Sequence, residues 1–508
     1  MANTLHDRLF TPLRGRASDF LILPDGARLS HGAFHDDAAR MAGAFRAAGL
    51  KQGDRVAMQL AKTPAMLAAI AGAIRAGVVF LPLNPAYTPE EVRYFVADSG
   101  AGLLLADPGA EHALSPVAKA AGARLMTLGD GGTGSFGALA SGLPPEAPDA
   151  DRGPGDLAAL LYTSGTTGRS KGAMLTHANL LSNAGVLTEA WEFTARDVLL
   201  HALPVFHTHG LFVATNVALI AGCPMIFLPR FDAAEVIAHL PRATAMMGVP
   251  TFYTRLLDHP GLTRDLVRHI RLFVSGSAPL LAETHREWEA RTGHRILERY
   301  GMTETNMNTS NPCRGERRAG TVGRPLPGIE VRVCGAEGSG MPQGEPGMIE
   351  VRGPNVFSGY WGMPEKTKED LRPDGFFITG DIGVFDADGY LSIVGRAKDV
   401  IITGGFNVYP KEVELALDAQ PGVAESAVIG VPHPDFGEAV VALVVPLPGA
   451  SPDPAALAEG IAGGLAGFKR PKRILIVPDL PRNAMGKVQK AALRSDYAAL
   501  FAPAPRSG

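Results

Sequence analysis

The chain has 508 residues, too many for one ordinary hydrophobic core, so two or three domains are expected. Hydrophobic residues make up 46% of the chain and charged residues 19%, which is typical of a folded globular protein rather than a disordered one. The 48 Lys and Arg against 51 Asp and Glu give a formal net charge of −3. No overall basic field therefore favours nucleic acid or an anionic membrane as a partner.

The three cysteines show neither metal-site spacing nor a disulfide framework, so we expect no structural zinc and a reducing compartment. Residues 1–8 lack the features of a signal peptide, and the C-terminal residues resemble no sorting signal. The most apolar window, 65–83, is interrupted by Arg75, Gly77 and Pro82, which predicts a helix, a turn and a strand rather than a membrane span. The expected location is cytoplasmic.

The first ~150 residues alternate between helical and strand patterns, as βα units do. Residues 30–48 have a helical spacing of apolar side chains, and 90–97 form a short helical pattern after a proline. The apolar runs 55–60, 77–81 and 103–106 predict strands of a sheet that is covered on both faces.

The same alternation resumes at Leu157, with a strand at 157–162 and a helix at 177–190. Further strands are predicted at 199–203, 224–228, 245–249 and 270–274. These patterns predict a large, mostly parallel α/β region that binds ligands at the carboxyl ends of its strands.

Short strand patterns at 331–333 and 348–351, separated by Gly and Pro, predict a small antiparallel barrel. A compact α+β unit of about a hundred residues follows. It contains a predicted helix at 410–419 and predicted strands at 425–430 and 440–445.

The stretch 162–172 (YTSGTTGRSKG) breaks a buried strand into hydroxyls, two glycines and a lysine. This composition suits an anion, because glycines let backbone N–H groups converge and the lysine supplies charge. The spacing Gly165-x-x-Gly168-x-x-Lys171 is not that of the common phosphate-binding loop. The alternative interpretation of the stretch, taken alone, is a flexible surface turn.

Six further segments follow in a fixed order: 204–211 (PVFHTHGL), 275–279 (SGSAP), 298–304 (ERYGMTE), 379–381 (TGD), 395–399 (GRAKD) and 481–487 (PRNAMGK). Together with the 162–172 stretch they resemble the motifs of the adenylate-forming superfamily of acyl-CoA synthetases, adenylation domains and luciferases. The resemblance spans nearly the whole chain. Segments 247–257, 278–288 and 300–312 are most similar to those of malonyl-CoA synthetases.

The resemblance implies a reaction in two steps. A carboxylate attacks the α-phosphorus of ATP and releases pyrophosphate, and the thiol of CoA then attacks the acyl-adenylate. Negative charge builds on the phosphates, so positioning and charge stabilisation dominate catalysis. The ATP-binding residues that the resemblance implies are Thr163, Ser164, Gly165, Thr166, Thr167, Gly168, Lys171, Ser277, Ala278, Pro279, Glu298, Arg299, Tyr300, Gly301, Met302, Thr303, Asp381, Arg396 and Lys487.

Within this set the resemblance gives catalytic roles to Thr303, which donates to the α-phosphate, and to Lys487, which bridges the carboxylate and the phosphate. Glu304 is the implied ligand of Mg²⁺, a metal that prefers oxygen. Asp381 is expected to bind the ribose hydroxyls and Tyr300 the adenine face. The competing structural interpretations are a helix cap for Glu304 and a turn residue for Asp381.

The resemblance also implies a region 1–397 that binds AMP and a mobile lid domain, 398–508, that rotates about Lys398 between the two steps. Gly404 and Gly405 are expected to face the pantetheine of CoA, and Lys469 and Arg470 its phosphates. A solvated basic face is the alternative for the last two residues.

The acid is expected to be a small dicarboxylate, malonate first and methylmalonate second. Arg255 and Arg286 lie in segments that flank the acyl pocket in the family, and a guanidinium suits a second carboxylate. Ser277 and Thr208 add hydroxyl donors, while Met307 limits bulk at the α-carbon. The remaining acyl-site residue, His207, is expected either to gate the thiol or to be a core histidine.

Three alternatives remain open: a synthetase for a short monocarboxylic acid, an adenylation enzyme that loads a carrier protein, and a non-catalytic nucleotide-binding scaffold. The expected partners are therefore small molecules (malonate, ATP and CoA), with Mg²⁺ as cofactor. The protein is expected to be a monomer or a homodimer.

Overall fold

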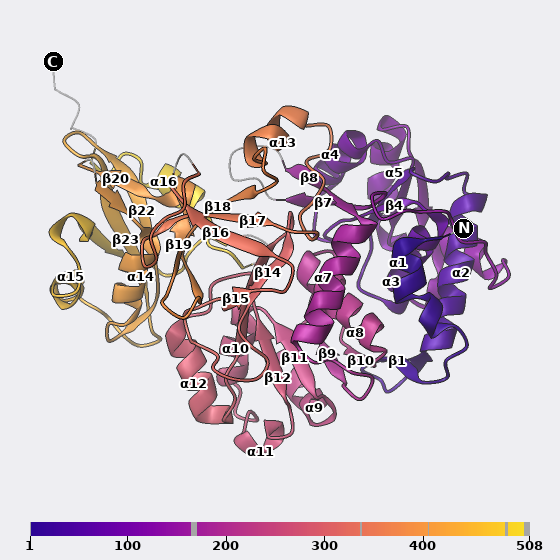
Figure 1. Ribbon diagram of the computed structural model, residues 1–508, viewed down its shortest axis with the longest axis horizontal. Coiled ribbons are helices and arrows are strands. Elements are labelled where there is room, and N and C mark those ends of the chain that lie inside the picture. Colours follow the sequence, from indigo (N-terminus) through magenta and orange to yellow (C-terminus); the bar gives the residue numbers. More distant parts are fainter. Residues whose placement is uncertain (1, 164–169, 336–337, 405, 483–485, 502–508) are drawn as a thin grey trace. The chain divides into compact units, whose positions relative to one another are not determined.

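The computed structural model describes residues 2–163, 170–335, 338–404, 406–482 and 486–501 (Figure 1). By its internal contacts the chain forms two compact units: Met1–Val331 with Val351–Phe377, and Arg332–Glu350 with Ile378–Gly508. The boundary between them differs from the predicted one at 397/398, since the contacts place 332–350 and 378–397 with the C-terminal residues. The rotation about Lys398 stays a prediction.

A six-stranded sheet of the first unit carries the 162–172 stretch. Its order is β6-β5-β3-β4-β7-β8, with all pairs parallel except the antiparallel pair β7–β8. The bounds are β3 Arg55–Gln59, β4 Val79–Pro82, β5 Leu103–Ala106, β6 Arg124–Thr127, β7 Leu157–Thr163 and β8 Lys171–Thr176. The predicted strands are confirmed, whereas β6 and β8 were not predicted.

Several helices of this region begin at polar caps, and some of them end at glycines, as the sequence pattern predicts. For example, the Ser30 hydroxyl accepts from the Ala33 N–H at the start of α2, and Gly77 ends α3 at a φ of 72°. The helices are α1 Thr4–Leu9, α2 His31–Ala47, α3 Pro64–Ala76, α4 Pro89–Ser99, α5 Glu111–Ala120, α6 Gly134–Ser141 and α7 His177–Ala190.

A nine-stranded sheet of the same unit has the order β15-β14-β13-β12-β11-β9-β10-β1-β2. Within this order, neighbouring strands pair in parallel from β13 through β12, β11, β9 and β10 to β1. Antiparallel strands flank them at both ends, β14 and β15 beside β13 and β2 beside β1. The bounds are β1 Asp19–Ile22, β2 Arg28–Ser30, β9 Leu199–His201, β10 Met225–Phe227, β11 Ala245–Gly248, β12 Leu272–Ser275, β13 Leu297–Met302, β14 Asn306–Ser310 and β15 Arg324–Pro325.

A short π-helix, η4 His209–Thr215, follows β9 and leads into α8 Asn216–Ala221. The other helices of this unit are α9 Ala233–His239, α10 Pro250–Leu257, α11 Arg264–Val267, α12 Ala282–Thr292 and α13 Pro364–Asp370. Trp288 of α12 is fully buried and meets Tyr253 and Phe273 edge to face, with ring centres 5.0 Å apart in both pairs. This aromatic cluster fixes α10 and α12 against β12.

The sheet β16-β17-β18-β19, whose residues lie mostly in the second unit, takes the place of the predicted barrel. Its order is open rather than closed, with β16 and β19 at its ends. The bounds are β16 Glu330–Cys334, β17 Gly347–Arg352, β18 Phe377–Phe385 and β19 Leu391–Arg396.

The rest of the second unit is a five-stranded sheet, β21-β20-β23-β22 with β24 on β23, and three α-helices in its described residues. The bounds are β20 Ile401–Thr403, β21 Phe406–Val408, β22 Val423–His433, β23 Gly437–Pro446, β24 Arg473–Ile476, α14 Pro410–Asp418, α15 Pro454–Ala462 and α16 Lys490–Asp496. The predicted α/β class with a small C-terminal α+β region is confirmed.

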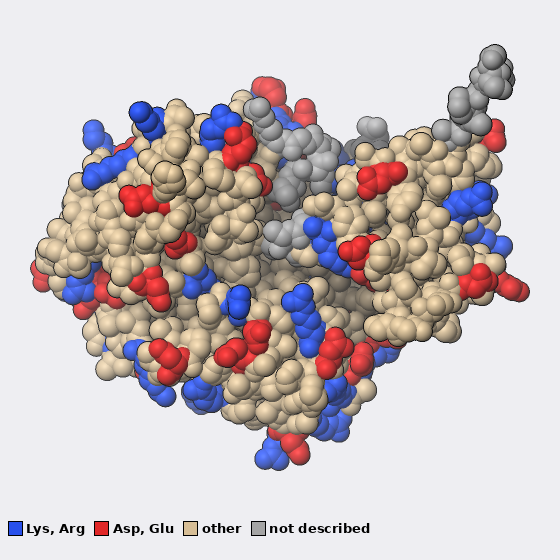
Figure 2. All heavy atoms as spheres, turned by 180° about the vertical axis from the view of Figure 1, so that it is seen from behind, with Lys and Arg blue, Asp and Glu red and all other residues tan. Residues whose placement is uncertain are grey.

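Acidic and basic side chains are interspersed over the face in Figure 2, without a broad area of one sign. In the described part of the chain, no helix combines the length and apolarity that a bilayer span requires.

Candidate active site

The two ends of the predicted anion loop are paired with each other. Thr163, the last residue of β7, lies opposite Lys171, the first residue of β8. The loop is therefore the connection of a β-hairpin and does not run from a strand into a helix. Five of its predicted ATP ligands lie outside the described residues: Ser164, Gly165, Thr166, Thr167 and Gly168.

Lys171 lies over the face of Tyr360, with its ammonium 4.2 Å from the ring centre. Its Nζ is also 3.9 Å from Asp370 Oδ2. The Lys171 and Asp370 side chains are about a fifth exposed (21% and 20%). The predicted phosphate ligand is thus a partly desolvated cation held by an aromatic face and a carboxylate.

Thr303 and Glu304 lie in the tight turn between β13 and β14, where Met302 pairs with Asn306. Asn306 has a φ of 49°. A Cβ at Gly301 would lie 1.8 Å from the Asn306 carbonyl oxygen, so only glycine allows the two strands this approach. The turn therefore gives the predicted α-phosphate donor and metal ligand a fixed position.

Glu304 is buried, and its Oε1 accepts a hydrogen bond of 3.1 Å from the Tyr360 hydroxyl. Burial, followed by the negative charges of Glu304 and Asp370, raises the pKa of the Tyr360 hydroxyl well above its usual range. The hydroxyl therefore keeps its proton and acts as a donor.

The donor atoms around Glu304 suit Mg²⁺, because they are hard oxygen atoms. Among the described residues, the one group of three His, Cys, Asp or Glu side chains close enough to share a metal is His6, Asp7 and Asp149. Asp149 of that group pairs with Arg75 over 2.7 Å, so the group is a structural ion-pair network. A single carboxylate at Glu304 fits a metal that arrives with ATP phosphates and water.

Arg299 on β13 is the buried cation that stands out near the predicted acid site. Its side chain is 3% exposed, and its Nε and Nη2 have no hydrogen-bond partner among the described residues. Burial lowers the pKa of its guanidinium to about 9. A Cβ at Gly276 would lie 2.4 Å from the guanidinium carbon, so Gly276 makes room for the arginine.

Ser277 and His209 complete this group. Ser277 has a φ of 71°, unusual for a residue other than glycine, and its hydroxyl lies 3.2 Å from His209 Nδ1. Burial, followed by the positive charges of Arg299 and His201, lowers the pKa of His209 well below its usual value. His209 is therefore neutral at pH 7, which leaves Arg299 as the positive charge of the group.

The two arginines that the sequence favoured for the acid, Arg255 and Arg286, are both exposed. The argument from a buried, uncompensated guanidinium therefore does not apply to them, and their role in substrate binding stays a prediction. The argument from a buried guanidinium applies instead to Arg299, which the family resemblance assigned to the adenine. No local signal marked Arg299 as the buried arginine, since its strand, 297–302 (LERYGM), also contains a glutamate.

The other residues predicted for the acid site lie on two elements. Thr208 is buried, and its hydroxyl has no partner among the described residues. His207 is partly buried beside the Phe206 ring, 4.5 Å between centres. Met307 is held by Asn183, which donates to the Met307 carbonyl over 2.8 Å and accepts from its N–H over 3.2 Å. Sequence reasoning missed Asn183.

The residues predicted around adenine follow β12 or lie on β13. Ala278 and Pro279 come directly after β12, and Tyr300 is buried on β13 opposite Thr309. Glu298 is buried and lies 3.2 Å from His285 Nδ1, and burial raises the pKa of its carboxyl. Glu298 therefore has a structural partner in α12.

Lys62 is a buried lysine that sequence reasoning missed. Its Nζ donates to His201 Nδ1 over 2.9 Å and to the His201 carbonyl over 2.8 Å. His201 Nε2 then donates to the Gly210 carbonyl over 2.9 Å, which fixes the tautomer. Burial lowers the pKa of Lys62 well below its usual value. This chain of hydrogen bonds secures the start of the π-helix next to His209.

In the second unit, Asp381 and Arg396 lie side by side on β18 and β19. Arg396 Nε is 2.7 Å from Asp381 Oδ1, and the carboxylate is 6% exposed. The Asp381 N–H donates to the Thr379 hydroxyl over 3.0 Å. The TGD segment therefore presents a buried, ion-paired carboxylate, and its predicted contact with ribose stays a prediction.

The residues predicted to contact CoA have structural partners. Lys469 is ion-paired with Glu412 at 2.6 Å. Arg470 donates to the carbonyls of Leu465 and Ala462, at 2.9 and 2.6 Å, beyond the end of α15. Gly404 is exposed with a φ of 56°. Gly405 lies outside the described residues.

Lys487 is exposed on a loop of the second unit whose two sides pair between Arg482 and Val488. Arg482 also donates to the Gly486 carbonyl over 2.7 Å. Lys398 is exposed in a short 3₁₀ turn, although the burial that remains lowers the pKa of its ammonium.

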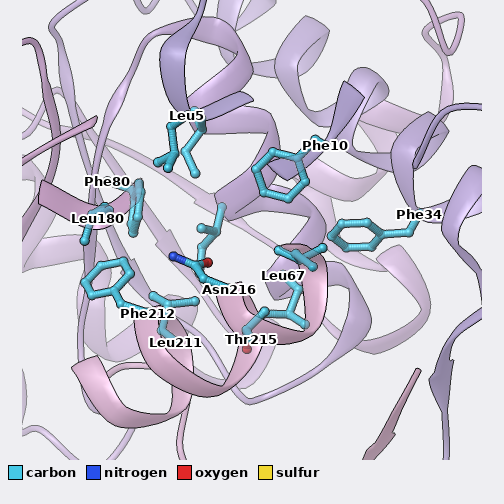
Figure 3. Close-up of a pocket in the computed structure, with 13 residues that line it drawn as sticks. Leu5, Phe10, Phe34, Leu67, Phe80, Leu180, Leu211, Phe212, Thr215 and Asn216 are labelled. Atoms are coloured by element: carbon cyan, nitrogen blue, oxygen red, sulfur yellow. The ribbon is translucent and has the colours of Figure 1, made fainter. Parts of the chain in front are cut away.

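A small apolar cavity of the first unit has none of the predicted site residues in its lining (Figure 3). Leucine, isoleucine and phenylalanine side chains line it, together with Thr215 and Asn216, and Figure 3 shows them converging. Its volume of about 20 Å³ accommodates about one water molecule, far less than a nucleotide or CoA requires.

Comparison with known proteins identifies the family of this arrangement. The family model described as AMP-binding enzyme matches residues 14–361, and the model of the AMP-binding enzyme C-terminal domain matches residues 412–487. The chain belongs to the AMP-binding enzyme family.

One relative is a malonate–CoA ligase of Arabidopsis thaliana, 37% identical over 481 residues that cover 88% of this chain and 78% of the relative. Another AMP-binding enzyme, a feruloyl-CoA synthase of an Amycolatopsis species, is 39% identical over 477 residues, covering 93% and 94%. The crystal structure of ATP-bound MatB from Rhodopseudomonas palustris is 54% identical, with a TM-score of 0.96 and coverage of 99% and 100%.

Proposed function

We propose that this AMP-binding enzyme is a malonate–CoA ligase. It joins malonate to AMP, with release of pyrophosphate, and then transfers the malonyl group to CoA. The similarity to a malonate–CoA ligase and to MatB supports this function. The similarity to a feruloyl-CoA synthase means that the acid has to be argued from the site itself.

Arg299 is the single observation that carries the choice of acid. A buried guanidinium without a partner costs several kcal/mol, so a ligand that supplies negative charge there gains binding energy. One carboxylate of malonate accepts from the unpartnered N–H groups of Arg299, with Ser277 as a further donor. The other carboxylate remains for attack on ATP. An acid with one carboxylate cannot occupy both positions.

The chain's own residues then assist the attack on the α-phosphorus. Lys171 offsets charge on the outgoing phosphates, Thr303 donates to the α-phosphate, and Lys487 offsets charge on the attacking carboxylate. Glu304 would hold Mg²⁺, which when bound neutralises phosphate charge. Water exclusion by the buried acid site protects the acyl-adenylate from hydrolysis.

A panel of acids tests the proposal. AMP release and CoA-dependent thioester formation are measured with malonate, methylmalonate, succinate, acetate, propionate and ferulate. We expect the highest kcat/KM with malonate, methylmalonate second, and at least about a hundredfold less with propionate, because one carboxylate pairing is lost. A higher kcat/KM with propionate or ferulate would refute the choice of malonate.

The same assay addresses the other functional classes. Thioester formation with free CoA would argue against an enzyme that only loads a carrier protein. Failure to release AMP with every acid would instead favour a non-catalytic nucleotide-binding protein.

A further inference from the structure

Tyr360 contacts two groups that the proposed function places at the triphosphate end of ATP. Its hydroxyl donates to Glu304 Oε1 over 3.1 Å, and its ring carries the Lys171 ammonium 4.2 Å from its centre. The tyrosine is 3% exposed. Lys171 comes from the six-stranded sheet and Glu304 from a turn of the nine-stranded sheet, so Tyr360 links the two sheets at this point.

The backbone around Tyr360 makes the same link. Residues 358–361 exchange three hydrogen bonds of 2.8–2.9 Å with residues 172–174 of β8. The N–H of Phe357 donates to the Glu304 carbonyl over 2.8 Å. The Tyr360 N–H donates to the Thr367 hydroxyl of α13 over 2.9 Å. A segment of five residues, 357–361, therefore holds β8 and the Glu304 turn together.

Charges of both signs surround Tyr360. Glu304 and Asp370 bring two carboxylates to its hydroxyl, and Lys171 brings an ammonium to its ring. Lys366 lies 3.0 Å from Asp370 Oδ1 and offsets that carboxylate. The hydroxyl carries one proton, which it donates to Glu304 Oε1 over 3.1 Å beside the neighbouring Asp370 carboxylate. Tyr360 can thus orient the Glu304 carboxylate without adding charge.

We propose that Tyr360 is a positioning residue for the Mg²⁺ complex of ATP: its hydroxyl orients the Glu304 carboxylate toward the metal, and its ring holds Lys171 in place for the phosphates. The inference rests on the proposed function, because it takes Glu304 as the metal ligand and Lys171 as a phosphate ligand. The hydroxyl and the ring have separable effects, which two variants distinguish.

Tyr360→Phe removes the hydroxyl and keeps the ring. Calorimetric titration with ATP, without any acid so that no reaction occurs, is carried out in EDTA and in MgCl₂. We expect the affinity for metal-free ATP to stay at the wild-type value. The gain in affinity that Mg²⁺ provides should fall about tenfold, since a hydrogen bond to a charged group is lost. The electron paramagnetic resonance spectrum of bound Mn²⁺·ATP should change as well.

Tyr360→Leu removes the ring too, so the affinity for metal-free ATP should fall about threefold to tenfold. Tyr253→Phe is the matched control: it removes a buried hydroxyl whose hydrogen bond, to the Val274 carbonyl over 2.6 Å, involves neither Lys171 nor Glu304. We expect wild-type titrations for it.

A wild-type Mg²⁺ gain in Tyr360→Phe would overturn the inference and leave the proposed function intact. Glu304→Gln distinguishes failure of the inference from failure of the proposed function. This variant should lose the gain in ATP affinity that Mg²⁺ provides, whether or not Tyr360 orients the carboxylate. If the unmodified protein gains no ATP affinity from Mg²⁺, the assignment of Glu304 fails and the inference fails with it.

Discussion

At the scale of single residues, Arg299 stands out because its charge is buried without an acidic partner among the described residues. Burial lowers the pKa of its guanidinium, so the charged form costs folding free energy at neutral pH. In the proposed function the second carboxylate of malonate supplies the missing partner. Substrate binding and stability are thus opposed at this one position.

Arg299→Met tests this opposition. The methionine fills similar space without charge, so we expect the KM for malonate to rise about 10- to 100-fold while the KM for ATP changes little. The Tm should not fall, because no partner is left unpaired. Steady-state kinetics and thermal unfolding measure both effects.

Arg255→Met is the control, because the Arg255 side chain is exposed. The choice of Arg299 predicts near wild-type kinetics for Arg255→Met, whereas the choice of Arg255 made from the sequence predicts a raised KM for malonate. If Arg255→Met raised the KM for malonate and Arg299→Met did not, the prediction made from the sequence would be the correct one.

The sequence motifs identified most of the candidate residues but could not rank them by burial. Arg255, Arg286 and Arg299 all stand in motif segments, and the first two are exposed. A surface arginine and a buried one have the same local sequence signal. The exposure of Arg255 and Arg286 follows only from how α10 and α12 pack. Asn183 and Lys62 belong to no motif, and their contacts come from distant parts of the chain.

At the scale of elements, the hairpin of β13 and β14 carries Thr303 and Glu304. Its close approach depends on Gly301, since a Cβ there would overlap the Asn306 carbonyl. Main-chain atoms cannot move aside as a flexible side chain can. The turn that presents the metal ligand would therefore have to shift.

Gly301→Ala should reduce the affinity for Mg²⁺·ATP at least about tenfold and lower the Tm, because overpacking against backbone is costly. Calorimetric titration and thermal unfolding measure these effects. Gly102→Ala is the matched control, since a Cβ at Gly102 meets nothing within 4 Å. Equal ATP affinities in the two variants would show that the close approach does not matter for the site.

The apolar strands of both large sheets could be predicted, because buried parallel strands are continuous apolar runs. β8 could not, since it begins with Lys171 and Gly172 and depends on pairing with β7. The π-helix after β9 also left no pattern, because it is set by contacts such as that of His201 with Gly210.

At the scale of the whole molecule, the proposed residues are divided between two compact units. Lys171, Arg299 and Glu304 belong to the first, and Asp381, Arg396 and Lys487 to the second. The sequence order of the motifs predicted such a division through the family resemblance. The domain boundary predicted at 398 differs from the boundary between the two units given by internal contacts, because no local sequence pattern determines which residues pack together.

Lys487→Gln tests the proposed contribution of the second unit to the first chemical step. The rate of adenylate formation, measured as pyrophosphate exchange in the presence of malonate, should fall at least about a thousandfold, because a charge beside the reacting atoms is lost. Transfer from supplied malonyl-adenylate to CoA should continue near the wild-type rate. Undiminished pyrophosphate exchange would contradict the role of Lys487.

The pairing of Thr163 with Lys171 limits how the chain length can vary here. Residues inserted between them lengthen only the connection, and doubling a loop's length costs about 0.6 kcal/mol. A deletion within β8 would instead shift the alternation of side chains by one and turn Lys171 away from the Tyr360 ring. The pairing of the strands therefore restricts the length of β8 more than that of the connection, whose length is restricted instead by the ATP ligands predicted in it.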